Sequence, residues 1–167
     1  MWEKSEGTGF LDAQSRPLKC HEIVSIFGEE EPYYVPQKTP GKPNHTRKPS
    51  PLGGSVIYNG AFTITESDLS GMKYPRSVQR FDIIKPQLRR HPNEKPLDLM
   101  QYLVRTYTNP GDTVLDFTSG SGTTLEACKI EGRRAIGIER DTDKDGACLG
   151  YCDYAVSRLR QEVLQLW

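Results

Sequence analysis

The stretch DFTSGSGTT, residues 116–124, contains the side chains best suited to hold a ligand. It follows the short apolar run TVLDF (113–117), which is typical of a buried parallel strand, and it precedes a segment with helical spacing. A glycine-rich turn between a strand and a helix exposes backbone N–H groups that bind anions. The sequence therefore predicts a ligand-binding turn that begins at Asp116.

The spacing of this turn fits some nucleotides better than others. A nucleoside triphosphate loop needs a lysine after its last glycine, but Thr123 follows Gly122. A dinucleotide loop needs a further glycine where Leu125 stands. Glu139, at the end of the next apolar run, is placed to accept hydrogen bonds from ribose hydroxyls, so a nucleoside with a small anionic group, such as S-adenosylmethionine, fits better. A plain strand–turn–helix connection also uses Gly and Ser and stays an alternative.

The elements that position this turn follow from the hydrophobic periodicity after residue 90. NPGD (109–112) ends a first helix, because Pro110 and Gly111 cannot continue it, and Gly132 is placed to end a second. The first helix has one apolar face, formed by Leu97, Met100, Leu103, Val104 and Tyr107. The predicted order is helix 96–107, strand 113–117, helix 123–130, strand 134–139 and a last helix from Tyr151 onward. This alternation predicts an α/β fold that contains half of a doubly wound sheet.

The first half of the chain has a different pattern. HEIVSIF (21–27) predicts a strand, and SVIYNGAFTIT (55–65) predicts a hairpin around Asn59-Gly60. Between them, residues 36–54 combine five prolines with four basic residues and no acids. Such a segment is too polar to build a packed core, so we expect an exposed, basic loop.

Three motifs in order resemble those of one enzyme family. Residues 91–96 match H-P-x-x-K-P with His91, Pro92, Lys95 and Pro96, residues 116–124 match the cofactor loop, and Glu139 matches a ribose-binding acid. In this order they resemble the C-terminal portion of the permuted (beta-type) S-adenosylmethionine-dependent DNA amino-methyltransferases, which are site-specific enzymes of bacterial and phage restriction–modification. The resemblance implies a partial Rossmann-like methyltransferase sheet, without its N-terminal strands and with a loop-rich basic insertion. We expect residues 1–90 to form a partial sheet with DNA-facing loops and hairpin, and residues 91–167 to form the cofactor-binding half.

The resemblance also implies a reaction and a cofactor site. The enzymes transfer the methyl group of S-adenosylmethionine to the exocyclic amine of a base flipped out of double-stranded DNA, usually adenine and sometimes cytosine. Carried over to this sequence, the cofactor-binding residues are Lys95, Pro96, Asp116, Phe117, Thr118, Gly120, Ser121, Gly122, Thr123 and Glu139.

The catalytic tetrapeptide of the family, D/N/S-P-P-Y/F/W, is missing from the sequence. The nearest string, EPYY (31–34), lacks one proline, and we interpret it as the start of the exposed loop rather than as a degenerate catalytic motif. Catalytic residues therefore stay unassigned. The opening MWEK corresponds to the middle of a strand of the family, so we expect a fragment or a split subunit that is inactive alone and needs a complementary chain. Two alternatives are a non-catalytic module that binds cofactor or DNA, and a Rossmann-like domain that acts on RNA or a small molecule.

Contacts to DNA are expected from local charge, because the formal net charge of the chain is zero. Residues 72–91 contain six basic side chains and one acid, Asp82. Charged loops are often simply solvated, which stays the alternative for each single residue. The predicted DNA-binding residues are Lys38, Lys42, Arg47, Lys48, Arg76 and Arg80.

The remaining composition argues against several other classes of protein. The four cysteines form no C-x-x-C pair, and no histidine completes a site with Cys148 and Cys152, so no metal is expected. The sequence has no 18-residue apolar run and its N-terminus has no apolar signal core. It therefore predicts a cytoplasmic protein with reduced thiols.

Overall fold

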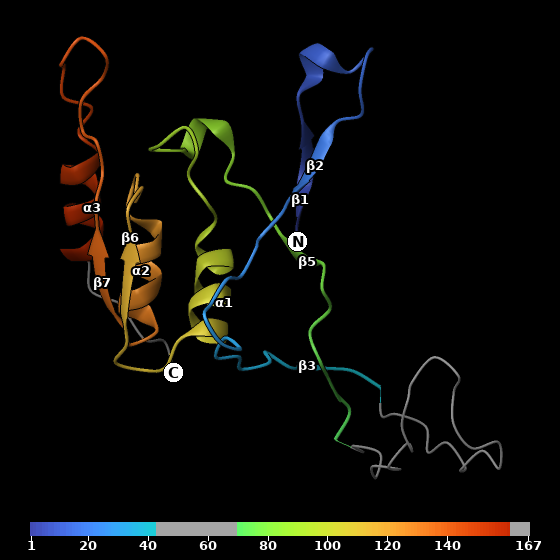
Figure 1. Ribbon diagram of the computed structural model, residues 1–167. Helices are drawn as coiled ribbons and strands as arrows, with labels where there is room; N and C mark the ends of the chain where they lie inside the picture. Colours follow the sequence, from blue (N-terminus) through green and yellow to red (C-terminus); the bar gives the residue numbers. More distant parts are fainter. Residues whose placement is uncertain (43–69, 161–167) are drawn as a thin grey trace, which may run out of the picture. The chain divides into compact units, whose positions relative to one another are not determined.

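The computed structural model describes residues 1–42 and 70–160 (Figure 1). They divide into two compact units, one containing Met1–Gln37 and the chain from Arg76 onward, the other Lys38–Pro75. The predicted hairpin 55–65 lies outside the described residues, as does most of the basic segment 36–54. The predicted boundary at residue 90 stays a prediction.

The larger unit contains a mixed three-stranded sheet near the N-terminus. Its strands are β1 (Trp2–Thr8), β2 (Lys19–Glu22) and β5 (Gln79–Phe81), in the order β2-β1-β5. β1 pairs antiparallel with β2 and parallel with β5. The Trp2 side chain is buried, and its Nε1 donates to the carbonyl of Phe81 at 3.0 Å, which ties the two parallel strands together.

The prediction of a strand at 21–27 was wrong in its bounds. β2 starts at Lys19 and ends at Glu22, which pairs with Trp2, the first residue of β1. Beyond Glu22 no residue of β1 remains to pair with, so the apolar residues that follow gain no sheet partner. Ile23 and Phe27 are exposed instead.

The smaller unit is described only by its ends. β3 (Thr39–Pro40) and β4 (Met72–Lys73) are two short strands that pair antiparallel with each other. The expected loop 36–54 therefore contains a strand at Thr39–Pro40, which corrects the prediction for those two residues.

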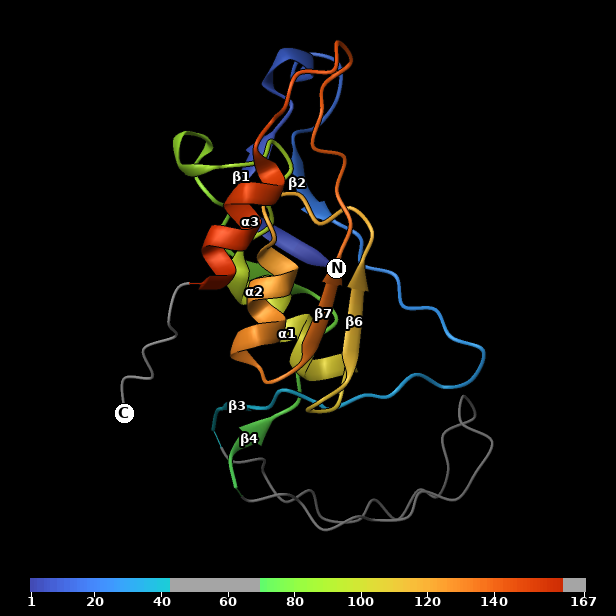
Figure 2. The same ribbon diagram turned by 90° about the vertical axis from the view of Figure 1, so that its left-hand side faces the viewer.

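The second part of the larger unit has the predicted α/β order. Its elements are α1 (Leu97–Tyr107), β6 (Thr113–Asp116), α2 (Thr123–Ile130), β7 (Arg134–Gly137) and α3 (Tyr151–Arg160). β6 and β7 are parallel, and Figure 2 shows α2 and α3 on one side of this pair. The prediction of an α/β fold is confirmed, with the two strands shorter at their C-terminal ends than expected. Two short 3₁₀ turns, Phe10–Asp12 and Pro86–Leu88, complete the described elements.

The core of this part lies between α1, α2 and β6. Val104, Ala127 and Cys128 are buried, and Leu97, Met100 and Val114 pack against them. Leu97, Met100 and Val104 belong to the predicted apolar face of α1. Leu99 lies off that face and is also buried, so α1 is covered on more than one side. All helices in the described ranges 1–42 and 70–160 are too short or too polar to cross a membrane.

Candidate cofactor site

The turn after β6 is shaped by its own backbone and by Asp116. The Asp116 Oδ1 accepts the Thr118 N–H at 3.0 Å, and the Gly122 N–H donates to the carbonyl of Ser119 at 2.8 Å. The Ser119 N–H donates to the carbonyl of Ile138 at 3.0 Å, which joins the turn to the chain after β7. The carboxylate at the end of β6 therefore fixes the start of the turn.

Two glycines of the turn have backbone conformations that side chains rarely adopt. Gly120 has φ +53° and Gly122, the N-cap of α2, has φ +79°. A Cβ at Gly120 would lie 3.1 Å from the His91 ring, and one at Gly122 would lie 2.8 Å from the Cβ of Ala155. Both glycines allow other segments to approach the turn closely.

Glu139 follows β7, and its carboxylate points toward the turn 116–124. Its Oε2 accepts the Gly120 N–H at 2.5 Å, and its Oε1 accepts the Arg140 N–H at 3.0 Å. The acid that the sequence predicts as a ribose acceptor thus also holds the backbone of the turn.

The segment 91–96 lies across the site from the turn 116–124. Glu94 Oε2 accepts the backbone N–H of Arg90 at 2.7 Å, which folds this segment back on itself. The Lys95 Nζ donates to the carbonyl of Asn93 at 3.2 Å and lies 3.6 Å from Glu22 Oε2. Pro96 is the N-cap of α1, so the segment leads directly into that helix.

The turn and the segment 91–96 enclose a cavity of about 440 Å³. This volume is within the range of about 300–1,000 Å³ typical of small-molecule sites. Its walls present the carboxylates of Glu94, Asp116 and Glu139 and the ammonium of Lys95. The lining residues are His91, Asn93, Glu94, Lys95, Met100, Asp116, Thr118, Ser119, Gly120, Ser121, Thr123, Thr124 and Glu139. A ligand with hydroxyl, ammonium and carboxylate groups would find a partner for each.

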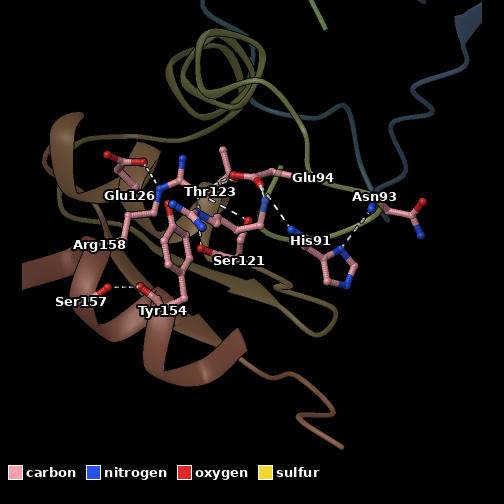
Figure 3. Close-up of polar contacts among 10 residues, drawn as sticks. His91, Asn93, Glu94, Ser121, Thr123, Glu126, Tyr154, Ser157 and Arg158 are labelled. Carbon is pink, nitrogen blue, oxygen red and sulfur yellow. Dashed lines mark hydrogen bonds and ion pairs between the residues drawn. The ribbon is translucent and has the colours of Figure 1, made fainter. Parts of the chain in front are cut away.

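Arg158 connects the two sides of the cavity from α3 (Figure 3). Its Nη1 lies 2.9 Å from Glu94 Oε1 and 3.0 Å from Thr123 Oγ1, and its Nε donates to Glu126. Only 4% of the Glu94 side chain is exposed, so this ion pair is largely shielded from solvent. Burial raises the pKa of Glu94, but the Arg90 N–H and the Arg158 guanidinium outweigh burial and lower the pKa below its ordinary value of 4.5.

The lowered pKa of Glu94 predicts a pH-dependent contribution to stability. A carboxyl whose pKa is lower in the folded chain stabilises it fully above pH 4.5 and loses this effect as the pH falls through the folded value. Glu94→Gln should therefore cost about 1.5–3 kcal/mol at neutral pH, and this difference should shrink on acidification. Urea unfolding of both proteins across this pH window measures it, with the exposed Glu29→Gln as the control. A difference between Glu94→Gln and the unsubstituted chain that stays constant below pH 4.5 would contradict the assignment.

The structure brings most of the predicted cofactor residues to one cavity. Phe117 and Gly122 do not line it, and neither does Pro96, which caps α1 beside it. Phe117 is largely exposed, 73% of its surface being accessible. The predicted residues that do line the cavity are Lys95, Asp116, Thr118, Gly120, Ser121, Thr123 and Glu139.

Other residues of the site escaped the sequence prediction. Asn93 and Glu94 occupy the variable positions of the H-P-x-x-K-P motif, so the motif could have pointed to them. Arg158 had no sequence signal, because its partners Glu94 and Glu126 lie 64 and 32 residues away.

EPYY (31–34) lies against the C-terminal end of α1. The ring centroids of Tyr34 and Tyr107 are 6.1 Å apart, and the Val35 N–H donates to the carbonyl of Thr106 at 2.8 Å. None of these four residues lines the described cavity. This placement agrees with the interpretation of EPYY as part of a loop.

The predicted DNA-binding residues are distributed over both units. Arg76 and Arg80 are exposed in the larger unit. In the smaller unit Lys42 is exposed, and the Lys38 Nζ lies 4.2 Å from the centre of the Tyr74 ring. Arg47 and Lys48 lie outside the described residues. The role of all six predicted residues in DNA binding stays a prediction.

Comparison with known proteins identifies similar sequences along most of the chain. The N6_N4_Mtase family, described as DNA methylase, matches residues 1–144. The type II methyltransferase M.Cfr9I of Citrobacter freundii is 28% identical over 149 residues, which cover 89% of this chain and 39% of that protein. The putative methylase YubD of Escherichia coli (strain K12) is 49% identical over 51 residues, which cover 30% of this chain and 22% of that protein.

Solved structures include similar chains as well. The crystal structure of the M1.HpyAVI–SAM complex is 38% identical with a TM-score of 0.42, and the match covers 53% of this chain and 40% of that one. The chain thus spans less than half the length of each of these proteins.

Proposed function

Because the chain belongs to the N6_N4_Mtase family of DNA methylases, we propose that it forms the cofactor-binding part of a site-specific DNA amino-methyltransferase. The observation that carries the proposal is the cavity between the segment 91–96 and the turn 116–124. The two motifs, which α1 and β6 connect in the chain, meet there together with the acid that follows β7.

S-adenosylmethionine is the cofactor of this family, and the donor set of the cavity fits it. We propose that Glu139 accepts hydrogen bonds from the ribose hydroxyls and that Asp116 pairs with the ammonium group. Lys95 would pair with the carboxylate, and the backbone of Gly120, Ser121 and Thr123 would line the cofactor. Gly122 would shape the turn behind them. When bound, the cofactor supplies an electrophilic methyl group on sulfur, and the residues of this chain hold and orient it.

The substrate we propose is an exocyclic amine of double-stranded DNA, with adenine as the preferred base because it is the usual target of the resembled subgroup. The target base would have to leave the stack to reach the cofactor. Exposed basic side chains support a role for the part before residue 90 in contacting the phosphates, with the cofactor-binding half after it. The proposed contacts are Lys38, Lys42, Arg47, Lys48, Arg76 and Arg80.

A complementary polypeptide with the catalytic tetrapeptide is the partner we propose. Parallel sheets are normally covered on both faces. On the face of the β6–β7 pair opposite α2, Leu115 and Ile136 are paired in register, and Phe117 and Ile138 continue the same alternation. These four side chains are 53% to 73% exposed. This apolar surface supports the proposal of a covering partner, without which the chain should be inactive.

The second candidate function is a non-catalytic module that binds cofactor or DNA. It is favoured by the absence of a D/N/S-P-P-Y/F/W tetrapeptide from the sequence. Incubation with tritiated S-adenosylmethionine and unmethylated DNA tests both: the chain alone should retain label without transferring it. Coexpression with the neighbouring genes of the source should restore transfer to adenine. No transfer in any combination favours the module. If no label is retained, cofactor binding by this chain is contradicted, and of the two candidates only a module that binds DNA alone is left.

A further inference from the structure

Arg158 reaches the cofactor cavity only through other residues. Its guanidinium contacts Glu94 on one side of the cavity and Ser121 and Thr123 on the other. These three partners line the cavity, whereas Arg158 is absent from its described walls. Any effect of Arg158 on a ligand must therefore pass through the positions of its partners.

The geometry requires the forked guanidinium group. Nη1 carries two hydrogens and makes its two shortest contacts with Glu94 and Thr123. Nε donates its one hydrogen to Glu126. A lysine has one nitrogen on a flexible stem and reproduces such a fork poorly. The Arg158 side chain is 13% exposed, so salt screens these interactions weakly.

A second contact from α3 supports the same turn. Ala155 lies one helical turn before Arg158, and its Cβ would be 2.8 Å from a Cβ built on Gly122. α3 therefore contacts the turn at two points, through the apolar Ala155 and through the hydrogen bonds of Arg158 to Ser121 and Thr123.

We propose that Arg158 is a positioning residue, which holds the segment 91–96 against the glycine turn so that Lys95 and the turn face the same ligand. The inference rests on the proposed function, in which Lys95 holds the amino-acid part of S-adenosylmethionine and Glu139 holds its ribose. Glu139 is placed by β7 and has no contact with Arg158 among the described interactions. Loss of Arg158 should therefore weaken binding of the amino-acid part more than binding of the adenosine part.

The test compares two ligands by isothermal titration calorimetry on the full chain. Methylthioadenosine contains the adenosine and methylthio groups of the cofactor but lacks its amino-acid part. Arg158→Gln should raise the dissociation constant for S-adenosylmethionine at least about tenfold, and that for methylthioadenosine less than about threefold. Arg158→Lys should recover part of the loss because it keeps the charge near Glu94. Arg160→Gln, an exposed change on the same helix, is the control and should leave both constants unchanged.

The possible outcomes separate this inference from the proposed function. Unchanged affinity for S-adenosylmethionine in Arg158→Gln, or equal losses for both ligands, overturns the positioning role. Circular dichroism verifies that each variant is folded, and Arg158→Lys provides the same comparison if Arg158→Gln does not fold. An unsubstituted chain that binds no S-adenosylmethionine overturns the proposed function and this inference together, which the first titration reveals.

Discussion

Asp116→Ala should reduce the affinity for S-adenosylmethionine at least about a hundredfold, to below detection in a calorimetric titration. The substitution removes the acceptor that fixes the Thr118 N–H and also the carboxylate proposed to pair with the ammonium group. Hydrogen bonds to charged groups contribute about 1.5–3 kcal/mol each, and about 1.4 kcal/mol corresponds to a tenfold change in affinity. Two such losses account for the expected effect.

Two further variants separate the contributions of Asp116. Asp116→Asn keeps an acceptor for the turn but loses the charge, so it should show an intermediate loss of about tenfold. Asp98→Ala removes an exposed acid from the first turn of α1, outside the cavity, and should leave the affinity unchanged. Wild-type affinity in Asp116→Ala would remove this residue from the proposed site.

Gly122→Ala should be among the most destabilising single methyl additions in the chain. A non-glycine residue at φ +79° costs about 1–2 kcal/mol in backbone strain. The new Cβ would also lie 2.8 Å from that of Ala155, closer than real Cβ contacts, and overpacking of this kind costs a further 1–3 kcal/mol or so. Urea unfolding should show a total loss of roughly 2–5 kcal/mol.

Gly132→Ala provides a matched control for the packing term. Gly132 has φ +71°, but no neighbouring atom lies within 4 Å of its added Cβ. This variant should lose only the backbone term of about 1–2 kcal/mol. Equal destabilisation of the two variants would mean that the close approach of α3 to the turn has no energetic consequence.

Local signals account for the part of the fold that the sequence predicts well. Pro110, Gly111 and Gly132 mark the ends of elements, and α1, β6 and α2 appear within one residue of their expected bounds. The turn between β6 and α2 follows from its glycines, which have the positive φ angles that such a turn needs. These features depend on residues that are adjacent in the chain, so a sequence pattern can report them.

Features that depend on distant partners were missed. β2 ends at Glu22 because its partner β1 begins at Trp2, and the apolar pattern of 21–27 contains no information about that register. In the sequence, Arg158 occupies what looks like an ordinary polar position of an amphipathic helix. Only the fold places Glu94 and Glu126 next to it. The motifs thus located the walls of the cavity, but not the residue that connects them.

The most direct test of the central proposal is an amide chemical-shift titration of the full chain with S-adenosylmethionine. If the cavity is the cofactor site, shifts should concentrate in 91–95 and 118–124 and at Glu139. Saturating cofactor that moves no amide, or that moves only residues outside the cavity, such as those of β2, would contradict the proposed site.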